Sequence, residues 1–175
     1  MPGTQFLSRP GTESVDPEPT RRGVEPMKNS AVEITNLLHR YAELMDTGDF
    51  EGCAALFADA AIILDHSPGA TPVDASTMLA LWRSSVIVYD DGTPHTRHLV
   101  TNPILAIDEE GGTATCRSTY TVFQQVPGSE FRPVASGRYH DRFERVDGIW
   151  RFSERDFTML DLVGDLSHHL TIDPP

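Results

Sequence analysis

The stretch TRHLVTNPILAIDEEGGTATCRSTYTVFQQV, residues 96–126, decides the fold class of this 175-residue chain. Its two halves, Thr96–Ile107 and Thr113–Val126, are rich in the β-branched and aromatic residues that favour strands. Between them lies Asp108–Gly112, an acidic and glycine-rich segment typical of a hairpin turn. The stretch therefore predicts two long antiparallel strands.

Two further strands are predicted toward the C-terminus. Gly137–Val146 and Ile149–Phe157 flank Asp147-Gly148, which is a strong signal for a two-residue hairpin. Beyond them, Leu160–Leu170 is predicted to form a short helix. The second half of the chain therefore reads mainly as an antiparallel meander.

The first half of the folded part is helical in pattern. Apolar residues recur with a period of about 3.6 residues before Gly48, and Ser30-Ala31-Val32-Glu33 fits a capping box at the start of this helix. A short strand is predicted at Ala61–Leu64. The predicted helices cover residues 30–47, 50–57 and 78–88.

Helices followed by a strand meander predict an α+β fold with the helices on one face of a curved sheet and a cavity between the two. Residues 31–160 form the predicted domain. Residues 1–30 hold five of the 13 prolines and few large apolar side chains, so we expect a disordered tail. Residues 161–175 are a C-terminal extension.

Composition excludes several classes of protein. With 14 Lys and Arg against 26 Asp and Glu, the net charge of −12 argues against nucleic acid and anionic membrane surfaces. No apolar run is long enough to cross a membrane. Cys53 and Cys116 belong to no motif, so we expect two reduced core cysteines in a cytoplasmic protein and no disulfide scaffold or metal site.

Several polar residues fall where a cavity wall is expected. Tyr41 lies on the apolar stripe of the first helix, so it is either part of the cavity wall or a core aromatic residue. Asp46 lies near the end of the same helix, so it is either part of the cavity wall or a solvated surface residue. His98 and Asn102 share one face of a predicted strand with apolar residues. Such polar groups cost free energy unless they are bonded, so they are either a satisfied structural pair or part of a pocket.

Other polar residues have simpler readings. Arg155, on the last strand, could bind an anionic substrate group or a neighbouring carboxylate. The His-x-x-His sequence His95–His98 would place its two rings on opposite sides of a strand, which disfavours metal binding. His168-His169 is expected at the surface. On Gly137–Val146, alternate residues including Tyr139, Asp141 and Phe143 share one face of the strand. The residues between them are charged and form the opposite face, which is expected to be solvated or subunit-facing.

Four blocks of sequence resemble the SnoaL-like family of the nuclear transport factor 2-like superfamily, in its scytalone dehydratase and bile-acid dehydratase branch. They are the residues 37–60, 96–102, 137–143 and 148–152. The resemblance implies a cone-shaped, curved antiparallel sheet wrapped by about three helices around one deep apolar pocket. It also implies a homodimer or higher homo-oligomer formed through the open sheet face.

The resemblance further implies catalytic roles for Tyr41, Asp46 and His98, which match the family positions. Asn102, Tyr120 and Arg155 are then candidate substrate-binding residues. The implied protein is a cofactor-free lyase or isomerase, either a dehydratase or a ketone isomerase, acting on a polyketide-like or steroid-like hydroxy-ketone. A noncatalytic binder or accessory small-subunit-like protein, and an aldol-type polyketide cyclase, remain open as alternatives.

Overall fold

The computed structural model describes residues 29–171 as three helices and six strands. The helices are α1 (Ser30–Thr47), α2 (Phe50–Leu56) and α3 (Ala75–Ser85). The strands are β1 (Ala61–Ile63), β2 (Thr96–Asp108), β3 (Thr113–Gln124), β4 (Arg132–Val146), β5 (Ile149–Asp156) and β6 (Leu160–Val163). The predicted tail of residues 1–30 lies, except for its last two residues, outside the described part of the chain.

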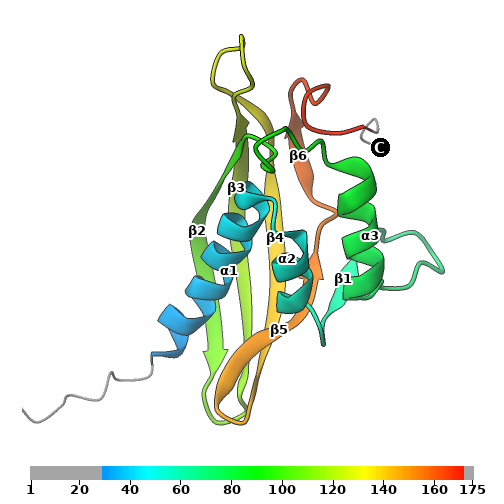
Figure 1. Cartoon of the computed structure of the whole chain (residues 1–175). Coiled ribbons are helices and arrows are strands. Elements are labelled where there is room, and N and C mark those ends of the chain that lie inside the picture. The colour runs from blue at the N-terminus through cyan, green and yellow to red at the C-terminus, as the bar shows by residue number, and fades with distance from the viewer. Residues whose placement is uncertain (1–28, 172–175) are drawn as a thin grey trace, which may run out of the picture.

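The strands form one sheet in the order β1-β5-β4-β3-β2, and β6 pairs with the end of β4 that β5 leaves open. Among the strand pairings of residues 29–171, only the short pairing of β1 with β5 is parallel. Figure 1 shows the three helices on one side of this curved sheet, with α1 lying across β2 and β3. The predicted α+β class, with about three helices against an antiparallel meander, is confirmed.

The core lies between the helices and the inward face of the sheet. Along β4 the side chains of Tyr139, Asp141 and Phe143 are buried, whereas the residues between them face solvent, as the alternating pattern predicts. Cys53 and Cys116 are both buried free cysteines, which confirms that they belong to the core.

The start of α1 differs from the prediction. Asn29 caps the helix, and its side chain accepts hydrogen bonds from the N–H groups of Ala31 and Val32. The Ser30 hydroxyl instead donates to Glu109 of the β2–β3 turn. The predicted capping box is therefore wrong by one residue, because Asn29 satisfies the free N–H groups first.

The predicted helix Leu160–Leu170 is also wrong. Its first residues form β6, and the chain then turns back toward the end of α3. There the N–H of Thr171 donates to the carbonyl of Ser85 at 2.8 Å, and Leu170 forms an isolated bridge with Val86. Strand pairing with β4 and contacts with α3 outweigh the weak local helix signal.

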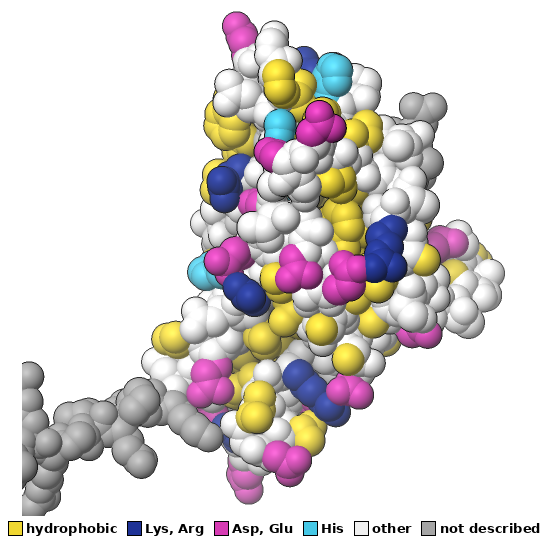
Figure 2. Space-filling view, viewed as in Figure 1, with side chains coloured by type: hydrophobic (Ala, Val, Ile, Leu, Met, Phe, Trp, Pro, Cys, Tyr) yellow, Lys and Arg dark blue, Asp and Glu magenta, His cyan; other side chains and the backbone are white. Residues whose placement is uncertain are grey.

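None of the described helices is long and apolar enough to cross a membrane. On the face shown in Figure 2, acidic side chains and arginines are interspersed rather than gathered by sign. That face therefore carries no extended basic patch of the kind that phosphate backbones require.

Candidate functional site

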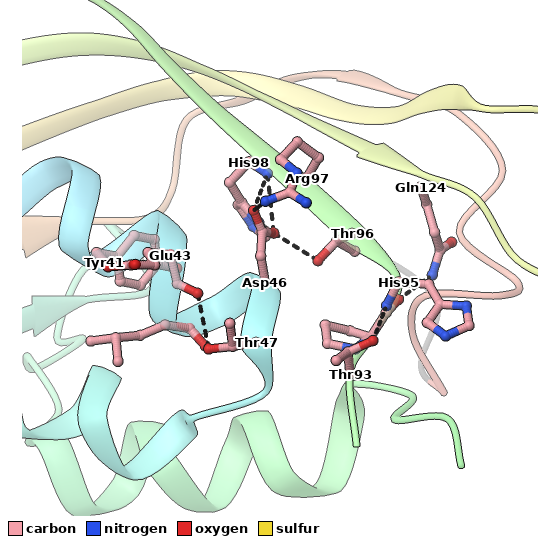
Figure 3. Close-up of polar contacts among 12 residues, drawn as sticks. Tyr41, Glu43, Asp46, Thr47, Thr93, His95, Thr96, Arg97, His98 and Gln124 are labelled. Carbon is pink, nitrogen blue, oxygen red and sulfur yellow. Dashed lines mark hydrogen bonds and ion pairs between the residues drawn. The ribbon is translucent and has the colours of Figure 1, made fainter. Parts of the chain in front are cut away.

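A buried carboxylate joins the end of α1 to the first residues of β2. Asp46, in the last turn of α1, accepts a hydrogen bond from Nδ1 of His98, with 2.6 Å between Nδ1 and Oδ1. The Thr96 hydroxyl donates to the same carboxylate at 2.9 Å, and so does the backbone N–H of His98. Figure 3 shows these contacts converging on Asp46 in the space between helix and strand.

The pKa of Asp46 is lowered despite its burial. Burial alone would raise it, but the hydrogen bonds and the attraction from His98, together with the Thr96 hydroxyl, outweigh burial. The exposed guanidinium of Arg97 lies 3.8 Å from the carboxylate. Asp46 is therefore an ionised hydrogen-bond acceptor at neutral pH.

The helix end explains how Asp46 reaches the sheet. Gly48 adopts a left-handed conformation with φ of 76°, and its N–H and that of Asp49 close the last turn. The sequence spacing between Tyr41 and Asp46 alone does not put them on one helix face. Both are nevertheless buried, because α1 packs along β2 and its last turn points at the strand.

The contact with Asp46 fixes the tautomer of His98. A carboxylate only accepts, so Nδ1 carries the proton and Nε2 is left with a free lone pair. Nε2 has no hydrogen-bond partner among residues 29–171. This nitrogen is therefore the one available to exchange a proton with a bound molecule.

His98 and Tyr41 lie on the wall of a cavity of about 310 Å³ between α1, α3 and the sheet. The polar or aromatic polar residues of the wall are Tyr41, Ser85, His98, Tyr120, Tyr139 and His169. The remaining wall is apolar: Met45, Met78, Leu81, Trp82, Val86, Val122, Ala135, Phe157, Leu160, Leu166 and Leu170. No Lys, Arg, Asp or Glu lines this cavity within the described residues. Asp46 stands behind His98.

Tyr41 is placed to donate a hydrogen bond into this cavity. Its ring centre lies 6.3 Å from that of His98, and its side chain is almost completely buried. Burial raises the pKa of Tyr41 well above its usual range, although the positive charge of Arg155 opposes this effect. The hydroxyl therefore stays protonated and remains a donor at all ordinary pH values.

Arg155 does not lie on the cavity wall. Its side chain is completely buried, and Nε and Nη2 bind the carboxylate of Asp141 at 2.7 and 2.9 Å. The two residues are register partners on β5 and β4, so strand pairing brings their inward side chains together. The guanidinium stacks beneath the ring of Tyr41, 4.5 Å from its centre. Of the two partners considered for Arg155, an anionic substrate group and a neighbouring carboxylate, the structure shows the carboxylate.

Asn102 is also placed away from the cavity. A register shift between Thr101 and Ile104 interrupts β2, and Asn102 adopts a left-handed conformation with φ of 53° just before Pro103. Its side chain is exposed. The predicted shared face with His98 fails because the bulge reverses the alternation of side chains. Tyr120, by contrast, lines the cavity and stacks on Tyr139, with 4.3 Å between ring centres.

The sequence reasoning missed His169, which was expected at the surface. Its side chain is buried and lines the cavity, whereas the neighbouring His168 is exposed. The only hint in the sequence is the apolar residues Leu166 and Leu170, whose spacing brackets this histidine. That pattern shows an apolar face but not where the face packs.

Metal-binding clusters of three or more His, Cys, Asp or Glu side chains do not occur in the described part of the chain. The two histidines of the His-x-x-His sequence bind different carboxylates. His95 contacts Asp91 at 2.8 Å and His98 contacts Asp46. They do not converge on one point, and His95, with φ of 55°, lies just before β2 rather than on the strand as predicted.

Comparisons with known proteins agree with the fold. Residues 29–156 match the SnoaL-like domain family. A protein of unknown function from Mycobacterium tuberculosis is 29% identical, with a TM-score of 0.58, over 79% of this chain and 76% of that one. No curated protein matches.

Two structures from Novosphingobium aromaticivorans are also similar, each at 23% identity and a TM-score of 0.58. One is assigned as a scytalone dehydratase and is matched over 78% of this chain and 87% of its own. The other is the beta subunit of a protein assigned as an aromatic-ring-hydroxylating dioxygenase, matched over 82% and 97%. At this identity the likeness concerns the fold alone, and the two proteins carry different assignments.

Proposed function

Because this chain belongs to the SnoaL-like domain family, we propose that it is a cofactor-free acid–base enzyme that dehydrates or isomerises a small neutral carbonyl compound. The observation that carries the proposal is the 2.6 Å contact between Asp46 and Nδ1 of His98, with His98 on the wall of an apolar cavity. A buried histidine backed by an ionised carboxylate is a proton-transfer group.

The first step of the proposed reaction is removal of a proton from the carbon next to the substrate carbonyl. Nε2 of His98 takes the proton, and the C–H electron pair forms the enolate. Asp46 stabilises the imidazolium that results, as the carboxylate does in a Ser-His-Asp triad. The Tyr41 hydroxyl donates a hydrogen bond to the enolate oxygen as its negative charge grows.

The second step uses the same proton. In a dehydration, the imidazolium of His98 gives it to the hydroxyl on the β-carbon, the C–O bond breaks, and water leaves as the enolate collapses to an enone. In an isomerisation, His98 returns the proton to another carbon of the conjugated system. Either path leaves His98 neutral and needs no redox change.

The cavity wall favours an uncharged substrate. A carboxylate or phosphate placed there would lose its hydration and meet no cationic side chain. Arg155 does not supply one, since it is already paired with Asp141. A volume of about 310 Å³ is at the small end for ligand pockets and fits a compact polyketide-like ring system; a steroid would need the cavity to widen.

The test uses β-tetralone, a bicyclic neutral ketone with acidic protons next to its carbonyl. We expect the wild-type protein to speed exchange of those protons for deuterium from heavy water, measured by proton NMR. His98→Asn should lower the rate by about 10²- to 10⁴-fold. His140→Asn, on the exposed face of β4, is the matched control and should leave the rate unchanged.

The same variants should be compared on an aromatic β-hydroxy ketone, whose dehydration is followed by the ultraviolet absorption of the enone. Enone formation supports the dehydratase, and exchange without elimination supports the isomerase or the aldol-type cyclase, which shares the base and the donor. Binding of β-tetralone without any exchange would contradict the enzyme and favour a noncatalytic binding or accessory role.

A further inference from the structure

The residues that follow β6 close one side of the cavity. The segment Gly164–Thr171 lies against the end of α3, and three of its side chains, Leu166, His169 and Leu170, form part of the cavity wall. It lies beyond residue 156, where the match to the family ends. The family match therefore says nothing about what this segment contributes.

The backbone of this segment is firmly held. The carbonyl of His168 accepts hydrogen bonds from Nε2 of Gln124 at 2.9 Å and from the Tyr89 hydroxyl at 2.7 Å. The carbonyl of His169 accepts one from the N–H of Ile87 at 2.9 Å. These bonds hold the backbone on both sides of the His169 side chain, which is buried and lines the cavity.

The His169 ring is buried without a bonding partner. It is only 8% exposed, and its Nδ1 has no hydrogen-bond partner in the part of the chain that the structure describes. Buried polar atoms are rarely left this way in proteins, because an unmade hydrogen bond costs about 1–3 kcal/mol. A leucine at this position would avoid the cost, so the ring is suited to a polar group brought by a ligand.

The charge state of His169 is set by its burial. Burial, and then the nearby His98, lower the pKa of His169 to about 4, with Asp46 acting in the opposite direction. The phenol groups of Tyr120 and Tyr139 on the same wall stay neutral, because burial raises their pKa values. His169 is therefore neutral at physiological pH, and presents one donor and one acceptor nitrogen.

We propose that His169 is a substrate-contacting residue, which the segment Gly164–Thr171 carries into the cavity to hydrogen-bond a hydroxyl or carbonyl of the bound molecule. This inference rests on the proposed function and refines its substrate class. The molecule is uncharged and carries an oxygen that His169 reaches in addition to the carbonyl that faces Tyr41 and His98.

A direct test measures binding rather than turnover. The probes are β-naphthol, a naphthalenediol with one hydroxyl on each ring, and naphthalene itself. Trp82 lies on the cavity wall, so quenching of its fluorescence reports occupancy, and Trp150→Phe provides a background without the second tryptophan. The variants are His169→Leu and His169→Asn, with His168→Leu as the matched control on the adjacent exposed residue.

We expect His169→Leu to weaken binding of the diol by about 5- to 10-fold and to leave naphthalene unchanged or slightly tighter. His169→Asn should recover part of the loss, because an amide can also donate and accept. His168→Leu should bind all three probes as the wild type does. Thermal melting of each variant verifies that the fold is kept.

Two results would overturn the inference. Equal weakening for the diol and naphthalene in His169→Leu would mean that the ring only shapes the cavity. Unchanged diol affinity in both His169 variants would mean that it makes no contact. Both results leave deuterium exchange by His98 intact, whereas a wild-type protein that binds none of the probes contradicts the proposed function as well.

Discussion

The buried neutral state of His169 predicts a loss of stability in mild acid. In the unfolded chain a histidine has a pKa of about 6.5, whereas in the folded protein the pKa of His169 is about 4. Between these values the unfolded chain binds one proton more than the folded protein does. The free energy of unfolding must therefore fall as the pH drops through this window.

The size of the effect follows from the two pKa values. Each pKa unit corresponds to about 1.4 kcal/mol, so acidification from about pH 7 to about pH 4.5 should remove about 2–3 kcal/mol through His169 alone. Asp46 does not contribute there. Its lowered pKa gives stability that is lost only below about pH 4.

This contribution can be measured by urea unfolding of the wild type and of His169→Asn at several pH values. It is the difference between the two proteins in how steeply the free energy of unfolding changes with pH. The variant has its own baseline stability, but it should lose about 2–3 kcal/mol less than the wild type over the window. Subtraction cancels the six other histidines, which both proteins share. Parallel curves for the two proteins would refute the reasoning, since they would mean that His169 is hydrated and titrates as it does in the unfolded chain.

Further predictions concern the site and its support. Asp46→Asn should lower β-tetralone exchange by about 10²-fold or more, because the amide no longer fixes the His98 tautomer or stabilises its imidazolium; a rate near wild type argues against that role. Tyr41→Phe should lower it by about 10²- to 10³-fold without changing the affinity for naphthalene. Arg155→Met should destabilise the protein by about 3–5 kcal/mol in urea unfolding, and adding Asp141→Leu should restore most of this, unless Arg155 has a role beyond the ion pair. We also expect self-association through the exposed sheet face, which sedimentation should detect as a dimer or larger assembly and a purely monomeric protein would disprove.

Most of the helices and strands could be predicted from the sequence because they depend on local patterns. The helical period before Gly48 and the hairpin at Asp147-Gly148 act within a few residues. The motif resemblance indicated Asp46 and His98, and the structure places them in direct contact.

The other site residues depend on long-range contacts that a local pattern does not contain. The side chain of Asn102 faces outward because of one irregularity in β2, and a single bulge reverses every later position. Arg155 finds Asp141 only once β5 has paired with β4. His169 enters the cavity because a segment after β6 folds back on α3, although the two are far apart in sequence.

The Asp46 carboxylate has a consequence for how this site can change during evolution. It accepts hydrogen bonds from the backbone N–H of His98 as well as from the ring. These bonds hold the last turn of α1 against β2, and this contact is needed even without catalysis. A descendant that did not carry out the proposed reaction would be free to replace His98 or Tyr41, but would be under pressure to keep the aspartate. In a comparison of related sequences, His98 is therefore the residue that would indicate the proposed activity. Asp46 without His98 would indicate only the fold.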